Sequence, residues 1–153
     1  MEIDADFNFQ RRFWVAQRVG WFFFALLIIA ALVGFFGTGP MSRASAQGPG
    51  LRIEYERFAR LQQPTKIRFV LYEARSASQI ELSGGYFDAV QIEQITPLPS
   101  AVESAGDRLV YRFTGPSPLS VTFHLKPEEF GSLAGAAKIS GGNAVPFRQF
   151  VYP

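Results

Sequence analysis

Two hydrophobic patterns divide the chain. Residues 19–38, VGWFFFALLIIAALVGFFGT, contain no charged side chain. A helix of about 20 residues, at ~1.5 Å per residue, matches the ~30 Å hydrocarbon core of a bilayer. From Leu51 onward, apolar and polar residues alternate with a period of two, which is typical of half-buried strands. The pattern predicts one N-terminal transmembrane α-helix followed by a β-domain.

The alternating segments are short and are separated by turns rich in glycine and proline. Seven or eight strands are expected in about 100 residues, with a bulge in the segment 86–95. This number and spacing predict an all-β domain, an antiparallel β-sandwich of the immunoglobulin-like type, with a small barrel as the alternative. The expected strands lie at 51–56, 66–71, 79–83, 86–95, 108–113, 119–126, 133–140 and 145–152.

Four segments follow from these patterns: a cytoplasmic amphipathic lead at 1–18, the transmembrane helix at 19–38, a flexible linker at 39–50 and the β-sandwich at 51–153. Asp4 or Asp6 is the expected cap of a helix that begins near Phe7. The sequence Gly-Thr-Gly-Pro at 37–40 is a helix stop signal. Residues 41–50, MSRASAQGPG, are small and polar, which is typical of a flexible tether.

The basic residues around the apolar segment predict its orientation. Three arginines precede it closely, whereas Arg43 and Arg52 follow at a greater distance. The positive-inside rule therefore favours a cytoplasmic N-terminus and a periplasmic β-domain in a bacterial inner membrane. Helical spacing also places aromatic and basic side chains on one side of the helix, as in an interfacial aromatic belt. The predicted membrane-interface residues are Arg11, Arg12, Trp14, Arg18 and Trp21.

A cleavable signal peptide is the alternative to a retained anchor, because Ala44-Ser45-Ala46 has the small-x-small pattern of a cleavage site. The apolar run is longer than the usual signal core of about 7–15 residues. The segment between that run and Ala46 is long and contains Arg43. A retained anchor is therefore favoured.

Three small residues recur every four positions within the apolar segment: Ala30, Gly34 and Thr38. Such a stripe lets two helices approach closely, and a threonine hydroxyl can form a hydrogen bond across the contact. These residues are therefore the helix-packing candidates. Because residues 19–38 hold no ionisable group, a proton or ion pathway along this helix is not expected.

The composition leaves little material for catalysis. The chain has no cysteine and a single histidine, His124, which disfavours thiolate metal sites and Ser-His-Asp triads. His124 is expected on the outer face of its strand, and Glu128-Glu129 in a solvated turn. From Gln47 onward, eleven Lys and Arg oppose ten Asp and Glu, without the basic stripe of a nucleic-acid-binding protein. No catalytic residue, cofactor or metal ligand is expected, and the chain is not expected to be an enzyme.

Three segments carry a resemblance to a known type of protein: QRRFWVAQRVGW before the apolar run, VGFFGTGP at its end, and EYERFARLQQPT after it. They are similar to small bacterial inner-membrane proteins with one span and a periplasmic β-domain. Such chains are associated with multi-span membrane proteins of the YetF-like kind. The resemblance implies an accessory role, but it implies no activity and no functional residue.

The sequence thus favours a membrane-anchored accessory or structural subunit. Its span is expected to pack on a multi-span membrane protein or on its own copies, with membrane lipid as the other partner and no role for nucleic acid. The alternative is a tethered periplasmic binding module whose sandwich loops hold a peptide, a lipid or an envelope component.

Overall fold

The computed structural model describes residues 3–32, 42–72, 78–83 and 85–153, with side chains from Phe13 onward. It divides into two compact units, Met1–Met41 and Ser42–Pro153. The first is mostly helix and the second is a β-domain.

Helix α1 covers Ile3–Leu32 without a break. It begins earlier than predicted, so Asp4 and Asp6 lie inside the helix and do not precede it. The predicted lead and the first part of the predicted span therefore form one helix. Its segment Phe13–Leu32 is long and apolar enough to cross a membrane, although a signal sequence near an N-terminus passes the same criterion. The predicted stop at 37–40 lies outside the described residues.

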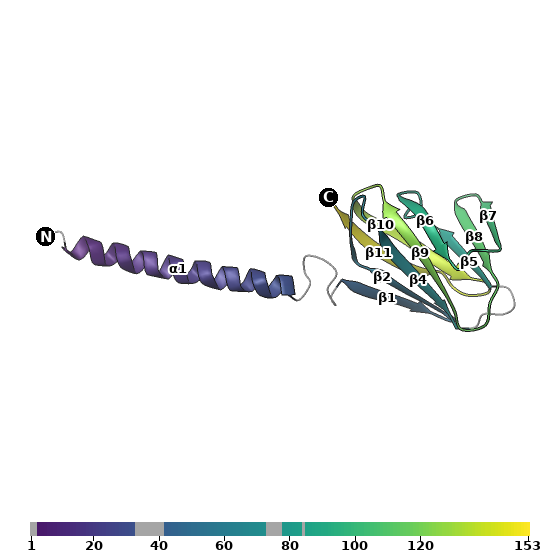
Figure 1. The fold of residues 1–153 in the computed structure, drawn as a ribbon, viewed down its shortest axis with the longest axis horizontal. Coiled ribbons are helices and arrows are strands. Elements are labelled where there is room, and N and C mark those ends of the chain that lie inside the picture. Colours follow the sequence, from purple (N-terminus) through teal and green to yellow (C-terminus); the bar gives the residue numbers. More distant parts are fainter. Residues whose placement is uncertain (1–2, 33–41, 73–77, 84) are drawn as a thin grey trace. The chain divides into compact units, whose positions relative to one another are not determined.

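The β-domain consists of two facing sheets, as Figure 1 shows. One has the order β1-β2-β4-β9-β6 and the other β3-β11-β10-β5-β8-β7. Every pairing is antiparallel except that between β3 and β11, which is parallel. The strands are β1 Arg43–Gly48, β2 Leu51–Glu56, β3 Phe58–Arg60, β4 Thr65–Leu71, β5 Ser78–Ser83, β6 Val90–Thr96, β7 Ala101–Ala105, β8 Arg108–Phe113, β9 Leu119–Pro127, β10 Gly131–Ile139 and β11 Val145–Tyr152.

The eight predicted strand segments all appear, but the segment predicted at 86–95 is a strand only from Val90 onward, because residues 86–89 form a turn. The predicted bulge lies in β6 between Ile92 and Gln94. The strands form two separate sheets, so the barrel alternative is wrong. The predicted number of strands is too low, because β1, β3 and β7 were not expected. All three are edge strands. An edge strand has one neighbour and little buried surface, so its sequence carries a weak alternating pattern.

The predicted flexible linker at 39–50 is wrong for residues 43–48, which form β1. This strand pairs with β2 along its whole length, from Arg43 opposite Glu56 to Gly48 opposite Leu51. The small residues of β1 are typical of a loop by composition, but they also allow this edge strand to pack closely. At Gly48, a Cβ atom would lie 2.4 Å from a Val145 methyl carbon of the other sheet.

The core lies between the two sheets and is built from aliphatic and aromatic side chains. Phe69 and Phe123 of one sheet meet edge to face at 5.3 Å, and Phe123 meets Tyr111 of the other sheet at 5.2 Å. Fully burying a side chain of this kind stabilises a fold by roughly 1.5–3 kcal/mol. Aromatic packing of this density lets a domain without cysteine close on its own core.

Candidate functional site

His124 lies on the outer face of β9 and is half-buried. In the strand register it stands opposite Lys66 of β4 on one side and Gln94 of β6 on the other. Neither neighbour is a carboxylate that would orient an imidazole for general-base catalysis. The structure thus places the histidine on the face the alternation predicted, in an ordinary cross-strand setting.

Carboxylates of the described residues do not gather with the histidine, since these residues contain no group of three His, Asp or Glu that could hold a metal ion. Glu128 and Glu129 are exposed where β9 ends, as the sequence predicted. The side-chain pKa shifts that are resolved belong to two tyrosines. Burial raises the pKa of Tyr86 and of Tyr111 above the ordinary value of 10.0.

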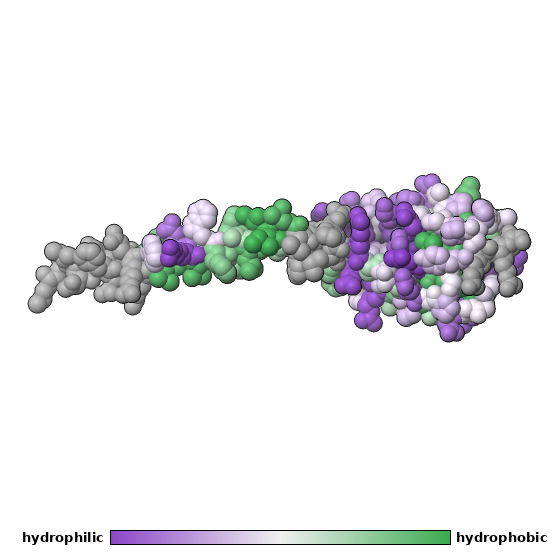
Figure 2. All heavy atoms as spheres, turned by 90° about the horizontal axis from the view of Figure 1, so that it is seen from below, coloured by the Kyte–Doolittle hydropathy of each residue, from purple (hydrophilic) through white to green (hydrophobic). Residues whose placement is uncertain are grey.

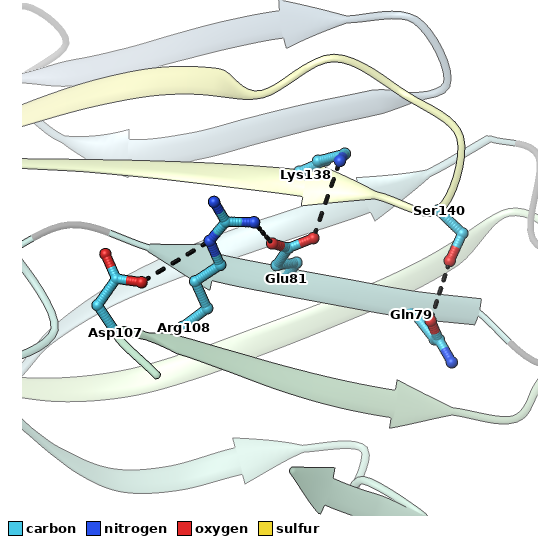
Figure 3. A network of polar contacts seen from close by, with 6 residues as sticks. All are labelled: Gln79, Glu81, Asp107, Arg108, Lys138 and Ser140. Carbon is cyan, nitrogen blue, oxygen red and sulfur yellow. Dashed lines mark hydrogen bonds and ion pairs between the residues drawn. The ribbon is translucent and has the colours of Figure 1, made fainter. Parts of the chain in front are cut away.

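A polar cluster on the outer face of the second sheet is centred on Glu81 of β5 (Figure 3). Its carboxylate accepts a hydrogen bond from Arg108 Nη1 of β8 at 2.8 Å and lies 4.0 Å from Lys138 Nζ of β10. Arg108 also lies 3.8 Å from Asp107, so two cations face two carboxylates. Exposed pairs of this kind contribute about 0–1 kcal/mol each. The cluster links three neighbouring strands, β5, β8 and β10.

A second polar cluster is buried between the sheets. Tyr86 donates its hydroxyl to Gln149 Oε1 at 2.7 Å, and neither residue is accessible to solvent. Gln149 Nε2 donates to the Glu56 carbonyl at 2.8 Å and to Thr65 Oγ1 at 3.4 Å. Each amide atom of Gln149 therefore has a partner, which marks the cluster as structural.

The hydrogen bonds of Tyr86 and Gln149 were not predicted from the sequence. A signal was present, because Gln149 interrupts the apolar positions of β11 at Val145, Phe147 and Val151 with a polar residue. A polar residue at an inward position predicts a buried hydrogen-bond partner, but the alternation does not say which strand supplies it.

The most unusual surface is that of α1. Large apolar side chains are exposed along the described part of the helix, and Figure 2 shows the apolar colour over its C-terminal half. At about 100° per residue, consecutive positions point in different directions, so these side chains surround the axis. They include Phe22, Phe23, Phe24, Leu26, Leu27, Ile28 and Ile29.

The predicted interface residues lie at the N-terminal side of this apolar surface. The Arg18 guanidinium stands 4.1 Å from the centre of the Trp14 ring, the cation-π geometry that a four-residue spacing allows. Trp14 and Trp21 are both exposed. Arg11 and Arg12 lie within α1, but their side chains are outside the described set.

The helix-packing candidates are only partly described. Ala30 lies in α1, two residues before Leu32. Gly34 and Thr38 lie outside the described residues, so the small-residue stripe stays a prediction.

Comparisons with known proteins show a distant similarity of fold. No protein-family model matches the chain. No curated protein matches it either. Among solved structures, a non-cellulosomal cohesin from the hyperthermophilic archaeon Archaeoglobus fulgidus is similar, with a TM-score of 0.41 and 10% sequence identity. The similarity covers 63% of this chain and 86% of the cohesin chain.

Proposed function

We propose that this chain is a membrane-anchored accessory or structural subunit of a bacterial inner membrane. In this proposal α1 crosses the membrane with its N-terminus in the cytoplasm, and the immunoglobulin-like sandwich lies in the periplasm. The observation that carries it is the exposed apolar surface around α1. Leaving such side chains in water costs roughly 1.5–3 kcal/mol each, whereas a bilayer accommodates all of them.

Strand β1 supports a retained anchor. Ala44, Ser45 and Ala46 pair with Tyr55, Glu54 and Ile53 of β2. Cleavage after Ala46 would remove most of β1 and leave the hydrogen-bonding edge of β2 open, a state that proteins avoid because open edges aggregate. The residues that resemble a cleavage site are thus part of the folded domain.

The accessory role rests on helix packing. Within a bilayer, small residues let a neighbouring helix approach closely, and the predicted stripe of Ala30, Gly34 and Thr38 offers such a face. A multi-span membrane protein or a second copy of this chain is the proposed partner.

Three variants of the full-length protein test this role after purification in mild detergent. Ala30→Leu and Gly34→Leu add bulk to the stripe, whereas Ala25→Leu adds the same bulk about 180° away from Gly34 on the helix. We expect the first two variants to lose the co-purifying membrane protein or the self-association, and Ala25→Leu to keep it. Unchanged association in all three would refute the proposed packing face.

Single cysteines test the orientation, because the natural chain contains none. A membrane-impermeant maleimide applied to cells with a permeabilised outer membrane should label a Ser120→Cys variant, whose site is exposed on β9. It should not label an Ala5→Cys variant until the inner membrane is lysed. The reverse labelling pattern would place the domain in the cytoplasm.

A tethered binding module is the second candidate, and one exposed loop favours it. Leu98 is 84% exposed between Pro97 and Pro99, and Val102 of β7 is exposed nearby in sequence. If these residues hold an envelope component, residues 42–153 should bind it and a Leu98→Asp variant should not. Ser120→Asp is the matched control on an exposed site of the other sheet. Retention of no component by the natural domain would remove this candidate.

A further inference from the structure

Among the described residues of the domain, most arginines without a carboxylate within 4.0 Å lie at one end of the sandwich. This end, called here the Ser42 end, holds Ser42, β3, the turn 128–130 and the C-terminal end of β11. Its parts are joined by backbone hydrogen bonds: Arg57 N donates to the Ser42 carbonyl at 2.6 Å, and Phe150 N donates to the Arg57 carbonyl at 2.7 Å. Figure 1 shows the start of β1 and the C-terminus at the same end of the domain.

Aromatic side chains are exposed at the Ser42 end. The parallel pairing of β3 and β11 sets Phe58 opposite Phe150, and their exposed fractions are 46% and 49%. Their neighbours Ala59 and Val151 are buried, so Phe58 and Phe150 lie on the outer side of the sheet. Phe130, just before β10, is 73% exposed. Single exposed apolar residues are ordinary, but Phe58 and Phe150 stand directly opposite each other, and Phe130 is exposed at the same end of the domain.

The arginines of the domain fall into two groups. Arg52, Arg68, Arg108 and Arg112 each lie within 4.0 Å of a carboxylate. Within the described residues, the other four have no such ion pair, and all four are exposed. They are Arg43, Arg57, Arg60 and Arg148.

Three of these arginines lie at the Ser42 end, and the fourth, Arg148, lies in the middle of β11. Arg43 begins β1, and Arg57 and Arg60 flank and end β3. Arg148 lies two positions before Phe150 on the same face of β11. Four carboxylates belong to this end too, namely Glu56, Asp88, Glu128 and Glu129, but among the described residues none of them lies within 4.0 Å of these arginines. The Ser42 end therefore presents guanidinium groups without an ion pair beside exposed phenylalanines.

We propose that the Ser42 end is a contact surface for phospholipid headgroups, and that it holds the sandwich against the membrane. Phenylalanine side chains beside arginines are a combination found in segments that bind at a membrane surface. Guanidinium groups without a carboxylate complement lipid phosphates, to which they donate paired hydrogen bonds. The inference rests on the proposed function, because it requires α1 to be in a bilayer.

The short connection between α1 and the domain supports lipid headgroups as the binding partner. Residues 33–41 join Leu32 to Ser42, and this stretch of chain reaches at most about 35 Å when fully extended. With α1 in a bilayer, the Ser42 end is thus the part of the domain that the covalent link holds within reach of the lipid surface. The guanidinium groups without an ion pair can attract lipid phosphates, and this attraction should weaken with salt.

Fluorescent labels on the full-length protein in vesicles of phosphatidylcholine and phosphatidylglycerol test this proposal. Ser132→Cys places a label at an exposed site of β10 opposite Phe150, and Ser120→Cys places one at an exposed site at the other end of the sandwich. Lipids with a shallow nitroxide should quench the first label and spare the second. Arg57→Glu combined with Arg60→Glu should abolish the quenching of the Ser132→Cys label, and high salt should reduce it.

A Leu27→Cys label in α1 separates the two proposals. If a deep nitroxide quenches this label while the Ser132→Cys label is unaffected by the shallow one, the headgroup contact is refuted and the membrane span survives. If neither label is quenched, both proposals fail. Equal quenching of the Ser132→Cys and Ser120→Cys labels would also refute a contact specific to the Ser42 end. Protection from aqueous iodide without lipid quenching would indicate a protein contact and would overturn the proposal.

Discussion

Replacing Tyr86 with phenylalanine removes one hydroxyl from the buried cluster and leaves the ring in place. The ring packs against Phe147 and Phe87, with centroids 5.0 and 5.2 Å away, and these contacts survive the substitution. What is lost is the 2.7 Å hydrogen bond to Gln149 Oε1. Because Gln149 is fully buried, water does not replace the donor.

The expected cost follows from this geometry. A buried acceptor left without a donor costs about 1–3 kcal/mol, so Tyr86→Phe should lower the free energy of unfolding by about 2 kcal/mol. Gln149→Leu should cost more, because it leaves the Tyr86 hydroxyl and the Glu56 carbonyl without their partner. In the double variant the stranded hydroxyl is gone as well. The two changes should therefore cost less together than their sum, by about 1 kcal/mol or more.

Urea unfolding of residues 42–153, followed by far-UV circular dichroism, measures these energies. The core residues all belong to this unit. Tryptophan fluorescence is unsuitable because Trp14 and Trp21 lie in α1. Tyr72→Phe, at an exposed tyrosine, is the matched control and should leave stability unchanged. A Tyr86→Phe domain as stable as the natural one, or strictly additive costs in the double variant, would refute a coupled buried network.

Three further predictions concern the domain. Gly135→Ala should destabilise the domain by about 1–3 kcal/mol, because the added Cβ would lie 2.8 Å from a Phe147 carbon and 2.9 Å from a Tyr86 carbon. Gly85→Ala is the control, since its Cβ would meet nothing within 4 Å, and thermal melting compares the two variants. Stability should fall as pH rises above about 10, because the unfolded chain then releases the phenolic protons that buried Tyr86 and Tyr111 retain; a Tyr86→Phe variant should show a shallower decline. Intact mass spectrometry of the membrane-extracted protein should find the chain uncleaved after Ala46. Loss of residues 1–46 would instead show that the N-terminal segment is a cleaved signal peptide.

Part of this structure was predictable because its patterns are strong and local. Eight strand segments were recognisable because each alternates, with its apolar positions in a core between two sheets. The outward position of His124 followed from the same period. The four-residue spacing placed Arg18 beside Trp14, where the cation-π contact is found. In each case neighbouring residues carry the information.

The three unpredicted strands show where local patterns end. The sequence of β1, RASAQG, is small and polar, and it is a strand because β2 supplies its hydrogen bonds. Strand β3 exists because the end of β11 lies alongside it in parallel, with about ninety residues between them in the chain. Composition argues for a loop in both places, and tertiary pairing overrides it.

The amino-acid sequence by itself determined that this protein has an apolar N-terminal helix and a β-rich domain without cysteine. Hydrophobic length and period depend on neighbouring residues and can be read without a fold. Only the tertiary structure decided that the supposed linker is an edge strand and that Tyr86 meets Gln149. The same holds for Arg43, Arg57 and Arg60, which lie at the Ser42 end and have no carboxylate within 4.0 Å among the described residues. Each of these depends on segments far apart in the chain, and it is the pairing of the strands that brings them together.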